Sequence, residues 1–284
     1  MAISVNGKKK QVKKTFEELL QDLKTNNSEK VRYNAARMFG EMGDAKAVEP
    51  LIDVLKSDKN GSVRLYAARA LGELGDSRAT THLIDSLRND RNVDVRVRAA
   101  RALGKLGGEI VVEPLVEALN DENPQVCITA TDALIEIGDV ATDALMASLD
   151  HEKVNVRCDA TRALGEIGNK KAVDKIISML YDEWVNVRIY AVTSLGKLND
   201  TKAVPALIDV MKNTEENELV RAGAAAALGV LRDTRALLPL RELIMDAEEL
   251  GELEDTALKS FKKIMAANWQ SIPGASVQKK VATV

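Results

Sequence analysis

Apolar residues recur along this chain with the spacing of amphipathic helices, and one such helix recurs as a unit. Residues 63–76 read VRLYAARALGELGD, and a helix with about 100° per residue gathers its apolar residues on one side. Seven copies of this unit begin 30 to 33 residues apart, at Val31, Val63, Val95, Val126, Val156, Val187 and Val220. A period of this length predicts a stack of repeats in which each unit packs mainly on its neighbours.

Each repeat is predicted to contain two helices joined by polar turns. In the first repeat Asp44 can cap a helix, whose apolar stripe is Val48, Leu51, Ile52 and Leu55. The second helix is the valine-initiated unit, called the VR helix below because arginine usually follows the valine. Candidate N-cap residues of the VR helices are Ser28, Asn60, Asn92, Asn123 and Asn217. Glycines that can end VR helices are Gly43, Gly75, Gly107, Gly138 and Gly168, and aspartates that can cap the next helix are Asp44, Asp76, Asp139, Asp200 and Asp233.

A glycine also recurs inside the VR helix, at Gly40, Gly72, Gly104, Gly165, Gly196 and Gly229. Glycine in a helix interior costs about 1 kcal/mol relative to alanine, so its recurrence predicts that neighbouring helices approach closely there. A bulky residue at Gly104 should therefore overpack a repeat junction, at a cost of about 1–3 kcal/mol.

The arginine beside each valine falls at the edge of the buried stripe. These arginines are Arg32, Arg64, Arg96, Arg157, Arg188 and Arg221, and the fourth repeat has Cys127 in their place. A residue repeated in every unit usually serves the stacking itself. We therefore expect a structural ladder, in which each arginine bridges to acidic groups or helix-end carbonyls of a neighbouring repeat.

The pattern divides the chain into three parts: a basic flexible tail at 1–14, a repeat solenoid at 15–267 and a flexible C-terminal tail at 268–284. The last VR helix is nearly all alanine. After it, Leu258, Phe261, Ile264 and Met265 predict a closing helix that shields the open end of the stack.

Composition narrows the function classes. The net charge is -3, which gives no global signal for nucleic acid. No apolar run approaches the roughly 20 residues needed to span a bilayer, and no apolar stretch follows the N-terminal lysines, so neither a membrane partner nor a secretory signal is expected. The two cysteines, Cys127 and Cys158, favour a reduced cytoplasmic setting over a disulfide framework.

The combined pattern resembles a known family. The run D-x-x-A-V-x-P-L-I-x-x-L from Asp44 to Leu55, followed by V-R-x-x-A-A-x-A-L-G-x-L-G-D from Val63 to Asp76, is similar to HEAT repeats of the HEAT-like class also found in phycobilisome lyases. The resemblance covers about residues 15–267. It implies an all-α fold, a right-handed α-α superhelix of about seven two-helix repeats with a C-terminal capping helix. It also implies that the solvent side of the VR helices lines a concave, partner-binding face.

On that implied face the candidate partner-binding residues are Tyr33, Arg37, Tyr66, Arg69, Arg98, Arg101, Arg162, Trp184 and Tyr190. Arginine and tyrosine often anchor interfaces, and arginine suits carboxylates and phosphates. A merely solvated face is the alternative, because Arg37, Arg69 and Arg162 each have a glutamate four residues later that can pair with them. Arg101 differs, since its neighbour at that spacing is Lys105.

The residues of the chain give little support for an enzymatic function. Deoxyhypusine hydroxylases resemble this chain and hold two irons with several His-Glu pairs, but the chain has only His82 and His151, with one such pair at His151 and Glu152. Phycobilin-lyase or chromophore-chaperone activity stays open by analogy of fold alone. No phosphate-cradling glycine loop or nucleophile-base pair is visible, so we predict no catalytic residues, metal ligands or cofactors.

The sequence therefore favours a non-catalytic cytoplasmic scaffold or adaptor that holds a protein partner, such as an acidic segment, in its concave groove. Nucleic-acid binding through the row of arginines is the alternative from another class. The acidic net charge and the lack of aromatic residues interleaved with the basic ones weigh against it.

Overall fold

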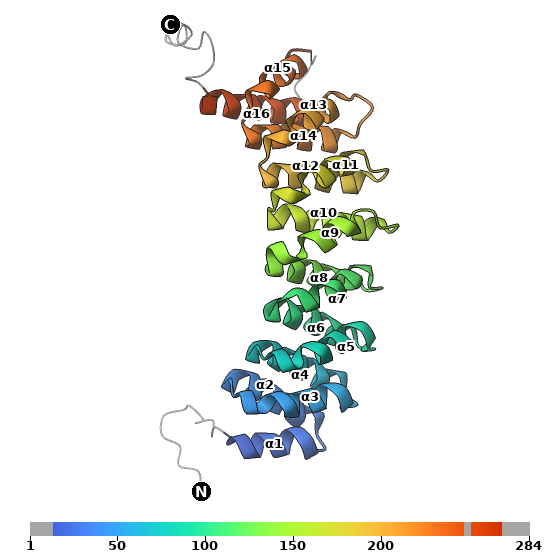
Figure 1. The fold of residues 1–284 in the computed structure, drawn as a ribbon, viewed down its shortest axis with the longest axis vertical. Helices are drawn as coiled ribbons and strands as arrows, with labels where there is room; N and C mark the ends of the chain where they lie inside the picture. Colours follow the sequence, from blue (N-terminus) through green and yellow to red (C-terminus); the bar gives the residue numbers. More distant parts are fainter. Residues whose placement is uncertain (1–13, 247–250, 269–284) are drawn as a thin grey trace. The chain divides into compact units, whose positions relative to one another are not determined.

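The computed structural model describes residues 14–246 and 251–268, and every regular element in those ranges is helical (Figure 1). The two predicted tails lie outside the described residues, apart from Lys14 and Asn268. The helices fall into two compact units, residues 1–114 with 123–133 and residues 115–122 with 134–284, which are considered separately. None of the described helices is both long enough and apolar enough to span a bilayer.

The first unit contains the helices that precede the middle of the chain. They are α1 (Phe16–Thr25), α2 (Glu29–Met42), η1 (Ala45–Ala47), α3 (Val48–Ser57), α4 (Gly61–Leu74), η2 (Ser77–Ala79), α5 (Thr80–Asn89), α6 (Val93–Leu106) and η3 (Glu109–Val111). Two helices, α7 (Val112–Glu117) and α8 (Pro124–Ile137), contribute residues to both units.

The second unit contains the remaining helices. They are η4 (Ala118–Asn120), η5 (Gly138–Ala141), α9 (Thr142–Ser148), α10 (Val154–Ile167), η6 (Lys170–Ala172), α11 (Val173–Ser178), η7 (Met179–Tyr181), α12 (Val185–Leu198), η8 (Thr201–Ala203), α13 (Val204–Lys212), α14 (Glu218–Leu231), η9 (Thr234–Ala236), α15 (Leu237–Met245) and α16 (Glu252–Asn268). The predicted two-helix repeats are confirmed, with α2, α4, α6, α8, α10, α12 and α14 as the VR helices.

The chain's own polar residues cap these helices, with two differences from the prediction. Asn60 accepts hydrogen bonds from the amides of Ser62 and Val63, at 2.8 and 3.3 Å, and so caps α4. Asp44 caps the short 3₁₀-helix η1 instead of α3, because its carboxylate accepts from the amide of Lys46 at 2.9 Å. The prediction for Asp139 was wrong, since this residue lies inside η5.

Left-handed backbone closes several VR helices. Gly43, Gly75 and Gly168 have φ between 67° and 79° in the left-handed region, where glycine meets no steric cost. The last two VR helices end the same way without glycine, at Asn199 with φ 49° and at Arg232 with φ 54°. A helix end that needs this conformation therefore tolerates other residues here.

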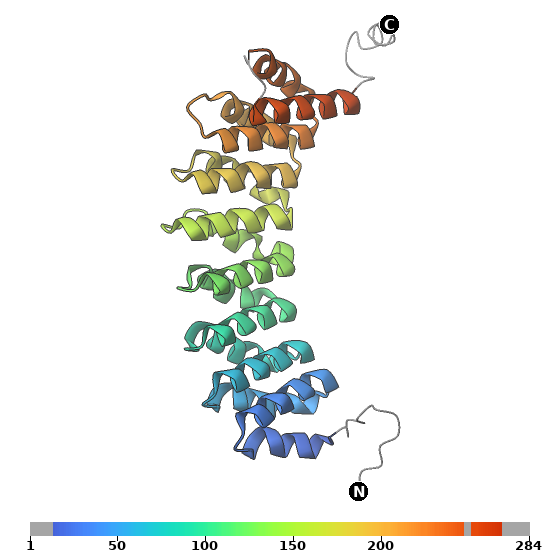
Figure 2. The same ribbon diagram turned by 180° about the vertical axis from the view of Figure 1, so that it is seen from behind.

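Neighbouring VR helices approach closely at the recurring glycines. A Cβ added to Gly72 of α4 would lie 2.7 Å from the Cβ and 2.9 Å from the Cα of Ala102 in α6, closer than real side chains pack. Equivalent glycines face small residues of the next helix, in the pairs Gly40–Ala70, Gly165–Ser194 and Gly229–Ser260. Seen from behind, the longer helices of each unit lie side by side in one layer (Figure 2).

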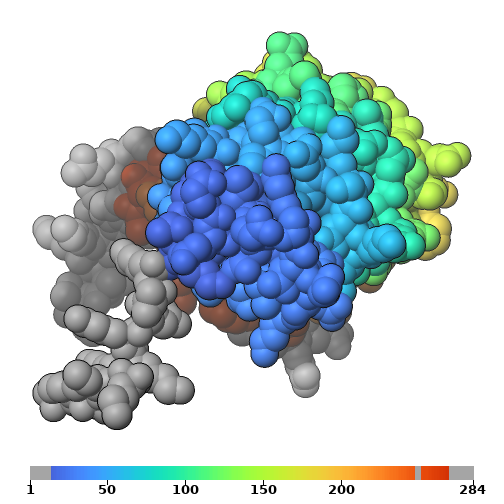
Figure 3. Space-filling model, turned by 90° about the horizontal axis from the view of Figure 1, so that it is seen from below, coloured from blue at the N-terminus to red at the C-terminus, as the bar shows by residue number. Residues whose placement is uncertain are grey.

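Terminal helices complete each unit. In the first unit Leu19 and Leu23 of α1 are buried, and Phe16 packs edge-on against Phe39 of α2, so α1 closes the end that faces the viewer in Figure 3. In the second unit α16 packs on α14 and α15. Its buried residues are Leu253, Ala257, Ser260 and Ile264, so of the predicted apolar stripe only Ile264 is fully buried. Three acidic residues, Glu252, Glu254 and Asp255, lie in the first turn of this helix.

Candidate functional site

The arginines that follow the valines form a network of buried hydrogen bonds between repeats. Arg64 of α4 donates from Nε and Nη2 to the two carboxylate oxygens of Asp90, both at 2.7 Å. The same guanidinium donates from Nη1 to the carbonyl of Asp58 at 2.9 Å and to that of Lys59 at 3.3 Å. Both side chains of the pair are only 8% exposed. Arg64 therefore ties the loop before its own helix to the loop before the next VR helix.

The same geometry repeats in both units. Arg32 pairs with Asp58, and the carbonyl of Asp58 accepts from Arg64, while the carbonyl of Asp90 accepts from Arg96. In the second unit Arg157 pairs with Asp182, the carbonyl of Asp182 accepts from Arg188, and Arg188 pairs with Glu216 at 2.7 Å. Arg221 donates to the carbonyl of Met211 at 3.0 Å. Each of these arginines thus serves contacts within the protein, and their guanidinium groups are not presented to a ligand.

Two aspartates of this network, Asp58 and Asp90, have lowered pKa values. Burial raises the pKa of Asp90, but the hydrogen bonds from Arg64 and from the Asn92 amide, together with the charge of Arg64, outweigh it and place the pKa below its ordinary value. The net shift of the Asp58 pKa is also downward, since Arg32 and the Asn60 amide outweigh burial. The two carboxylates therefore stabilise the fold above about pH 4 and lose this effect as pH falls through their lowered pKa values.

The network changes at two positions, one in the fourth repeat and one in the fifth. Cys127 replaces the arginine, and its Sγ lies 3.6 Å from the carbonyl of Asn123. In the next repeat His151 stands where the sequence register has Asp58, Asp90 and Asp182 in other repeats. Its Nδ1 accepts from the amide of Lys153 at 3.0 Å, as those aspartates accept from the amide two residues on. His151 therefore keeps the local turn without a carboxylate.

The predicted partner-binding arginines differ in how far their charge is compensated. Arg37 pairs with Glu41 on α2 at 2.5 Å, and Arg69 pairs with Glu73 on α4 at 2.7 Å. Pairs with this spacing on an exposed helix face stabilise it only slightly. The neighbouring rings of Tyr33 and Tyr66 stack on each other, with centroids 5.1 Å apart and an interplanar angle of 19°. The α2–α4 part of the predicted face is therefore largely engaged with itself.

The α4–α6 part of the same face carries uncompensated positive charge. A cleft of about 290 Å³ is lined by Arg69, Gly72, Glu73, Arg98, Arg101, Ala102 and Lys105. The floor of the cleft is formed by small residues, because Gly72 and Ala102 lie where the two helices touch. Around that floor stand four cations and one carboxylate, and the carboxylate of Glu73 is already bound to Arg69. Within the part of the chain that the structure describes, Arg98, Arg101 and Lys105 make no ion pair.

The other candidates lie in the second unit. Arg162 is half-buried on α10, and the neighbouring Glu166 pairs with Lys197 of α12. Trp184 is the N-cap residue of α12 and 52% exposed, whereas Tyr190 lies further along that helix and is 38% exposed. Aromatic ring contacts in the described ranges are confined to Phe16–Phe39 and Tyr33–Tyr66, so Trp184 and Tyr190 do not form a ring pair.

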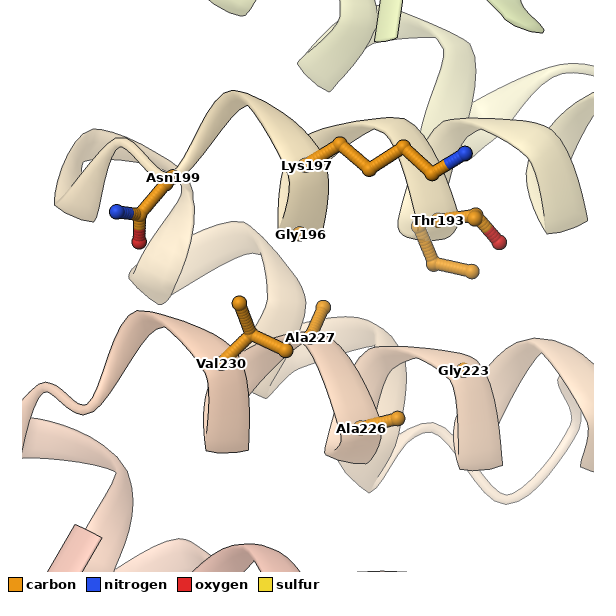
Figure 4. A pocket seen from close by; sticks show the side chains of 9 residues that line it. Thr193, Gly196, Lys197, Asn199, Gly223, Ala226, Ala227 and Val230 are labelled. Carbon is orange, nitrogen blue, oxygen red and sulfur yellow. The ribbon is translucent and has the colours of Figure 1, made fainter. Parts of the chain in front are cut away.

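A second hollow, which the sequence pattern does not single out, lies between α12 and α14. It measures about 540 Å³, and the lining residues are Val192, Thr193, Gly196, Lys197, Asn199, Gly223, Ala226, Ala227 and Val230 (Figure 4). Most of these side chains are small or apolar. The signal that could have found it is the alanine-rich sequence of α14, read against the charged residues at the same positions of other VR helices.

The chemistry of the side chains gives no sign of a metal centre in the described ranges. No three or more His, Cys, Asp and Glu side chains are placed there to hold a metal ion together. Cys158 is half-buried, and burial, with help from Asp159 and Asp182, raises the pKa of its thiol to about 11. This thiol is therefore a weak nucleophile at neutral pH.

The fold and these faces define an α-helical solenoid of paired helices. The sequence profile of HEAT repeats matches residues 16–104, 80–157, 112–186, 142–215 and 174–260, so the chain belongs to the HEAT repeat family. None of the curated proteins compared with the chain matches it significantly.

The solved structures that match this chain are only distantly similar to it in sequence. Human deoxyhypusine hydroxylase in complex with glycerol is 22% identical, with 88% of this chain and 96% of that chain covered and a TM-score of 0.41. The CpcE–CpcF complex of phycocyanin lyase from Nostoc sp. PCC7120 is 22% identical, with coverage of 92% and 100% and a TM-score of 0.45. The karyopherin Kap121p bound to the extreme C-terminus of the phosphatase Cdc14p is 15% identical, with coverage of 94% and 36% and a TM-score of 0.65.

Proposed function

We propose that this chain is a non-catalytic interaction scaffold that holds an acidic segment of a partner protein against its VR helices. The observation that carries the proposal is the α4–α6 cleft, in which Arg98, Arg101 and Lys105 stand together without a carboxylate of their own. Guanidinium groups bind carboxylates in a bidentate manner, and such charge-assisted hydrogen bonds are stronger than neutral ones. An acidic side chain of a partner would supply the missing counter-charge.

The position of Glu73 explains why the excess charge faces α6. Its Oε1 binds Arg69, and its Oε2 would lie 2.4 Å from a Cβ added to Gly40, so this carboxylate lies beside α2. Glu73 also lines the α4–α6 cleft, but its Oε1 is already bound to Arg69, so the α6 cations have no carboxylate of their own. We therefore assign the acid-binding role to Arg98, Arg101 and Lys105. Arg69 lies at the edge of the cleft, and its charge is neutralised by Glu73.

The fold supports a protein as the partner. Kap121p, whose fold is similar, has been solved with the extreme C-terminus of another protein bound. The proposal includes a reducing, cytoplasmic setting, which is supported by the two free cysteines, Cys127 and Cys158.

The test is a binding titration with a short fluorescent peptide rich in Asp and Glu. The double substitution Arg98→Gln and Arg101→Gln is expected to weaken binding at least about tenfold, because each lost charge-assisted hydrogen bond is worth about 1.5–3 kcal/mol. The matched control is Arg37→Gln, since Arg37 lies at the same VR-helix position as Arg101 but is paired with Glu41. Binding to the wild type should also weaken with added salt.

Three results would count against this function. Equal peptide affinity in the double variant and the wild type would remove the cleft from binding. A duplex nucleic acid that binds tightly while the acidic peptide does not would favour the nucleic-acid alternative. A loss of several kcal/mol of stability in the double variant would mean that Arg98 or Arg101 serves the fold instead of a partner.

A further inference from the structure

The hollow between α12 and α14 is a second site with different chemistry. In Figure 4 the side chains of Ala227 and Val230 rise from α14 toward the backbone of α12 at Gly196. Gly196 and Ala227 hold the two helices at ordinary contact distance, because a Cβ on Gly196 would lie 3.4 Å from the Cβ of Ala227. The hollow therefore has a floor of aliphatic carbon and backbone.

The hollow exists because α14, the last VR helix, has smaller side chains than the other VR helices at the positions that line it. Three positions of the VR helix form columns across the repeats, and in α14 they hold Gly223, Ala226 and Val230. The first column elsewhere reads Asn34, Tyr66, Arg98, Thr129, Asp159 and Tyr190. The second reads Arg37, Arg69, Arg101, Asp132, Arg162 and Thr193. The third reads Glu41, Glu73, Lys105, Glu136, Glu166 and Lys197.

Val230 shows that this change is not explained by packing within the chain. In every other VR helix the third column is charged, yet Val230 is 49% exposed. Contact with water does not stabilise an exposed valine side chain. Free energy is released when a second apolar group covers an aliphatic side chain at the edge of a hollow and removes its surface from water. An apolar partner group that covered Val230 would therefore gain free energy.

Positive charge lies directly beside the apolar floor. A cleft of about 420 Å³, lined by Asn199, Gly229, Val230, Leu231, Arg232 and Lys263, shares Asn199 and Val230 with the hollow. Within residues 14–246 and 251–268 neither Arg232 nor Lys263 makes an ion pair, whereas Lys197 is held by Glu166. The occupant that matches both parts combines an apolar side chain with a carboxylate a short distance away.

We propose that the α12–α14 hollow and the adjoining Arg232–Lys263 cleft bind a segment of a partner protein in which an aliphatic side chain is followed or preceded by an acidic residue. The aliphatic side chain covers Val230 and Ala227, and the carboxylate meets Arg232 and Lys263. This site goes beyond the α4–α6 cleft and does not depend on it. It selects segments by an apolar anchor, where the first cleft selects by charge alone.

The substitutions that test this site change its apolar floor and its cations separately. Ala226→Gln and Val230→Gln together place uncharged polar side chains over the floor, and both positions are exposed, so the fold is expected to persist. Arg232→Asn keeps the left-handed helix end, because Asn199 occupies the equivalent place in α12. Lys263→Gln removes the second cation. Leu238→Lys, on the exposed surface of α15 outside the hollow, is the matched control.

The assay is fluorescence anisotropy of a short peptide with adjacent leucines flanked by Asp and Glu, titrated with the full chain. The Ala226→Gln/Val230→Gln variant should bind at least about tenfold more weakly, which corresponds to the loss of one buried aliphatic side chain. The Arg232→Asn/Lys263→Gln variant should bind more weakly and with a shallower salt dependence. The titrations use the Arg98→Gln/Arg101→Gln background, so that the α4–α6 cleft does not take up the acidic peptide, and in this background Leu238→Lys should leave the affinity within about twofold, well below the tenfold step of one buried side chain. Circular dichroism checks that each variant is folded.

Several outcomes would overturn the assignment. The first is an unchanged affinity of the leucine peptide for the variant that carries polar residues at 226 and 230. The second is equal binding of a peptide in which serine replaces leucine. The third is a peptide of residues 269–284 that binds the hollow more tightly than the acidic peptide, which would make the occupant a segment of this chain instead of a partner. If only the α6 substitutions weaken the leucine peptide, the first cleft alone binds partners and the second site is refuted.

Discussion

The buried arginine network makes a sharp prediction about stability at Arg64. Arg64→Ala removes both hydrogen bonds to Asp90 and the donor to the carbonyls of Asp58 and Lys59. The Asp90 carboxylate, whose side chain is 8% exposed, would keep its hydrogen bond from the Asn92 amide but lose its counter-charge. Removing one partner of a buried pair costs about 3–5 kcal/mol, because the other charge stays desolvated.

We expect a loss of about 3 kcal/mol, at the lower end of that range, because water reaches part of the pair. Urea denaturation followed by circular dichroism measures it. In a repeat protein a weakened junction can also separate the transition into two steps, so the shape of the curve is part of the result. The comparison is Arg78→Ala, which removes an arginine bound to Asp76 and Glu49 on the open surface, and which should leave the midpoint unchanged.

The decisive experiment adds Asp90→Asn to Arg64→Ala. Asparagine keeps an oxygen for the Asn92 amide and removes the stranded charge, so the double variant should recover about 1–2 kcal/mol of the loss. Additive losses, or a single-variant loss below about 1 kcal/mol, would show that the network does not carry the junction between α4 and α6.

Two further predictions concern packing and reactivity. Gly72→Ala should lower the free energy of unfolding by about 1–3 kcal/mol, because the new Cβ would meet Ala102 at 2.7 Å. Gly196→Ala should raise it by up to about 1 kcal/mol, because its Cβ would lie 3.4 Å from Ala227, and the same sign for both in urea denaturation would contradict the packing account. Cys158, with a pKa of about 11, should be alkylated by iodoacetamide about two orders of magnitude more slowly at pH 8 than an ordinary thiol, with a rate that rises up to about pH 11. Asp159→Asn should speed the reaction, as followed by mass spectrometry, and a rate that levels off near pH 9 would contradict the raised pKa.

The fold was predictable because the residues that each repeat needs for its structure recur several times along the sequence. The valine that begins each VR helix, the internal glycine and the polar cap recur, so one departure such as Ser28, which caps without a side-chain hydrogen bond, does not hide the pattern. Local details were less predictable. The cap at Asp44 serves η1, since a short 3₁₀-helix cannot be told from the start of α3 by its apolar spacing alone.

The candidate sites were predictable only in part, because a surface depends on which charges neutralise each other. The sequence placed Arg37, Arg69 and Arg101 in one row, and the spacing of Glu41, Glu73 and Lys105 already separated the third from the first two. Two features needed coordinates. The carboxylate of Glu73 lies beside α2, and Arg98 joins Arg101 and Lys105 around one cleft.

The α12–α14 hollow shows that positions at which one repeat differs from the others are as informative as positions that recur in every repeat. A scan for arginine and tyrosine passes over α14, because Gly223, Ala226 and Val230 offer neither type. Compared with the same columns in the other repeats, these residues mark the one VR helix whose outer face is aliphatic, and the cleft with Arg232 and Lys263 lies next to it. In α14 the three residues that leave the pattern change together, which is expected when a group of neighbouring positions serves a single interaction instead of the stacking common to all repeats.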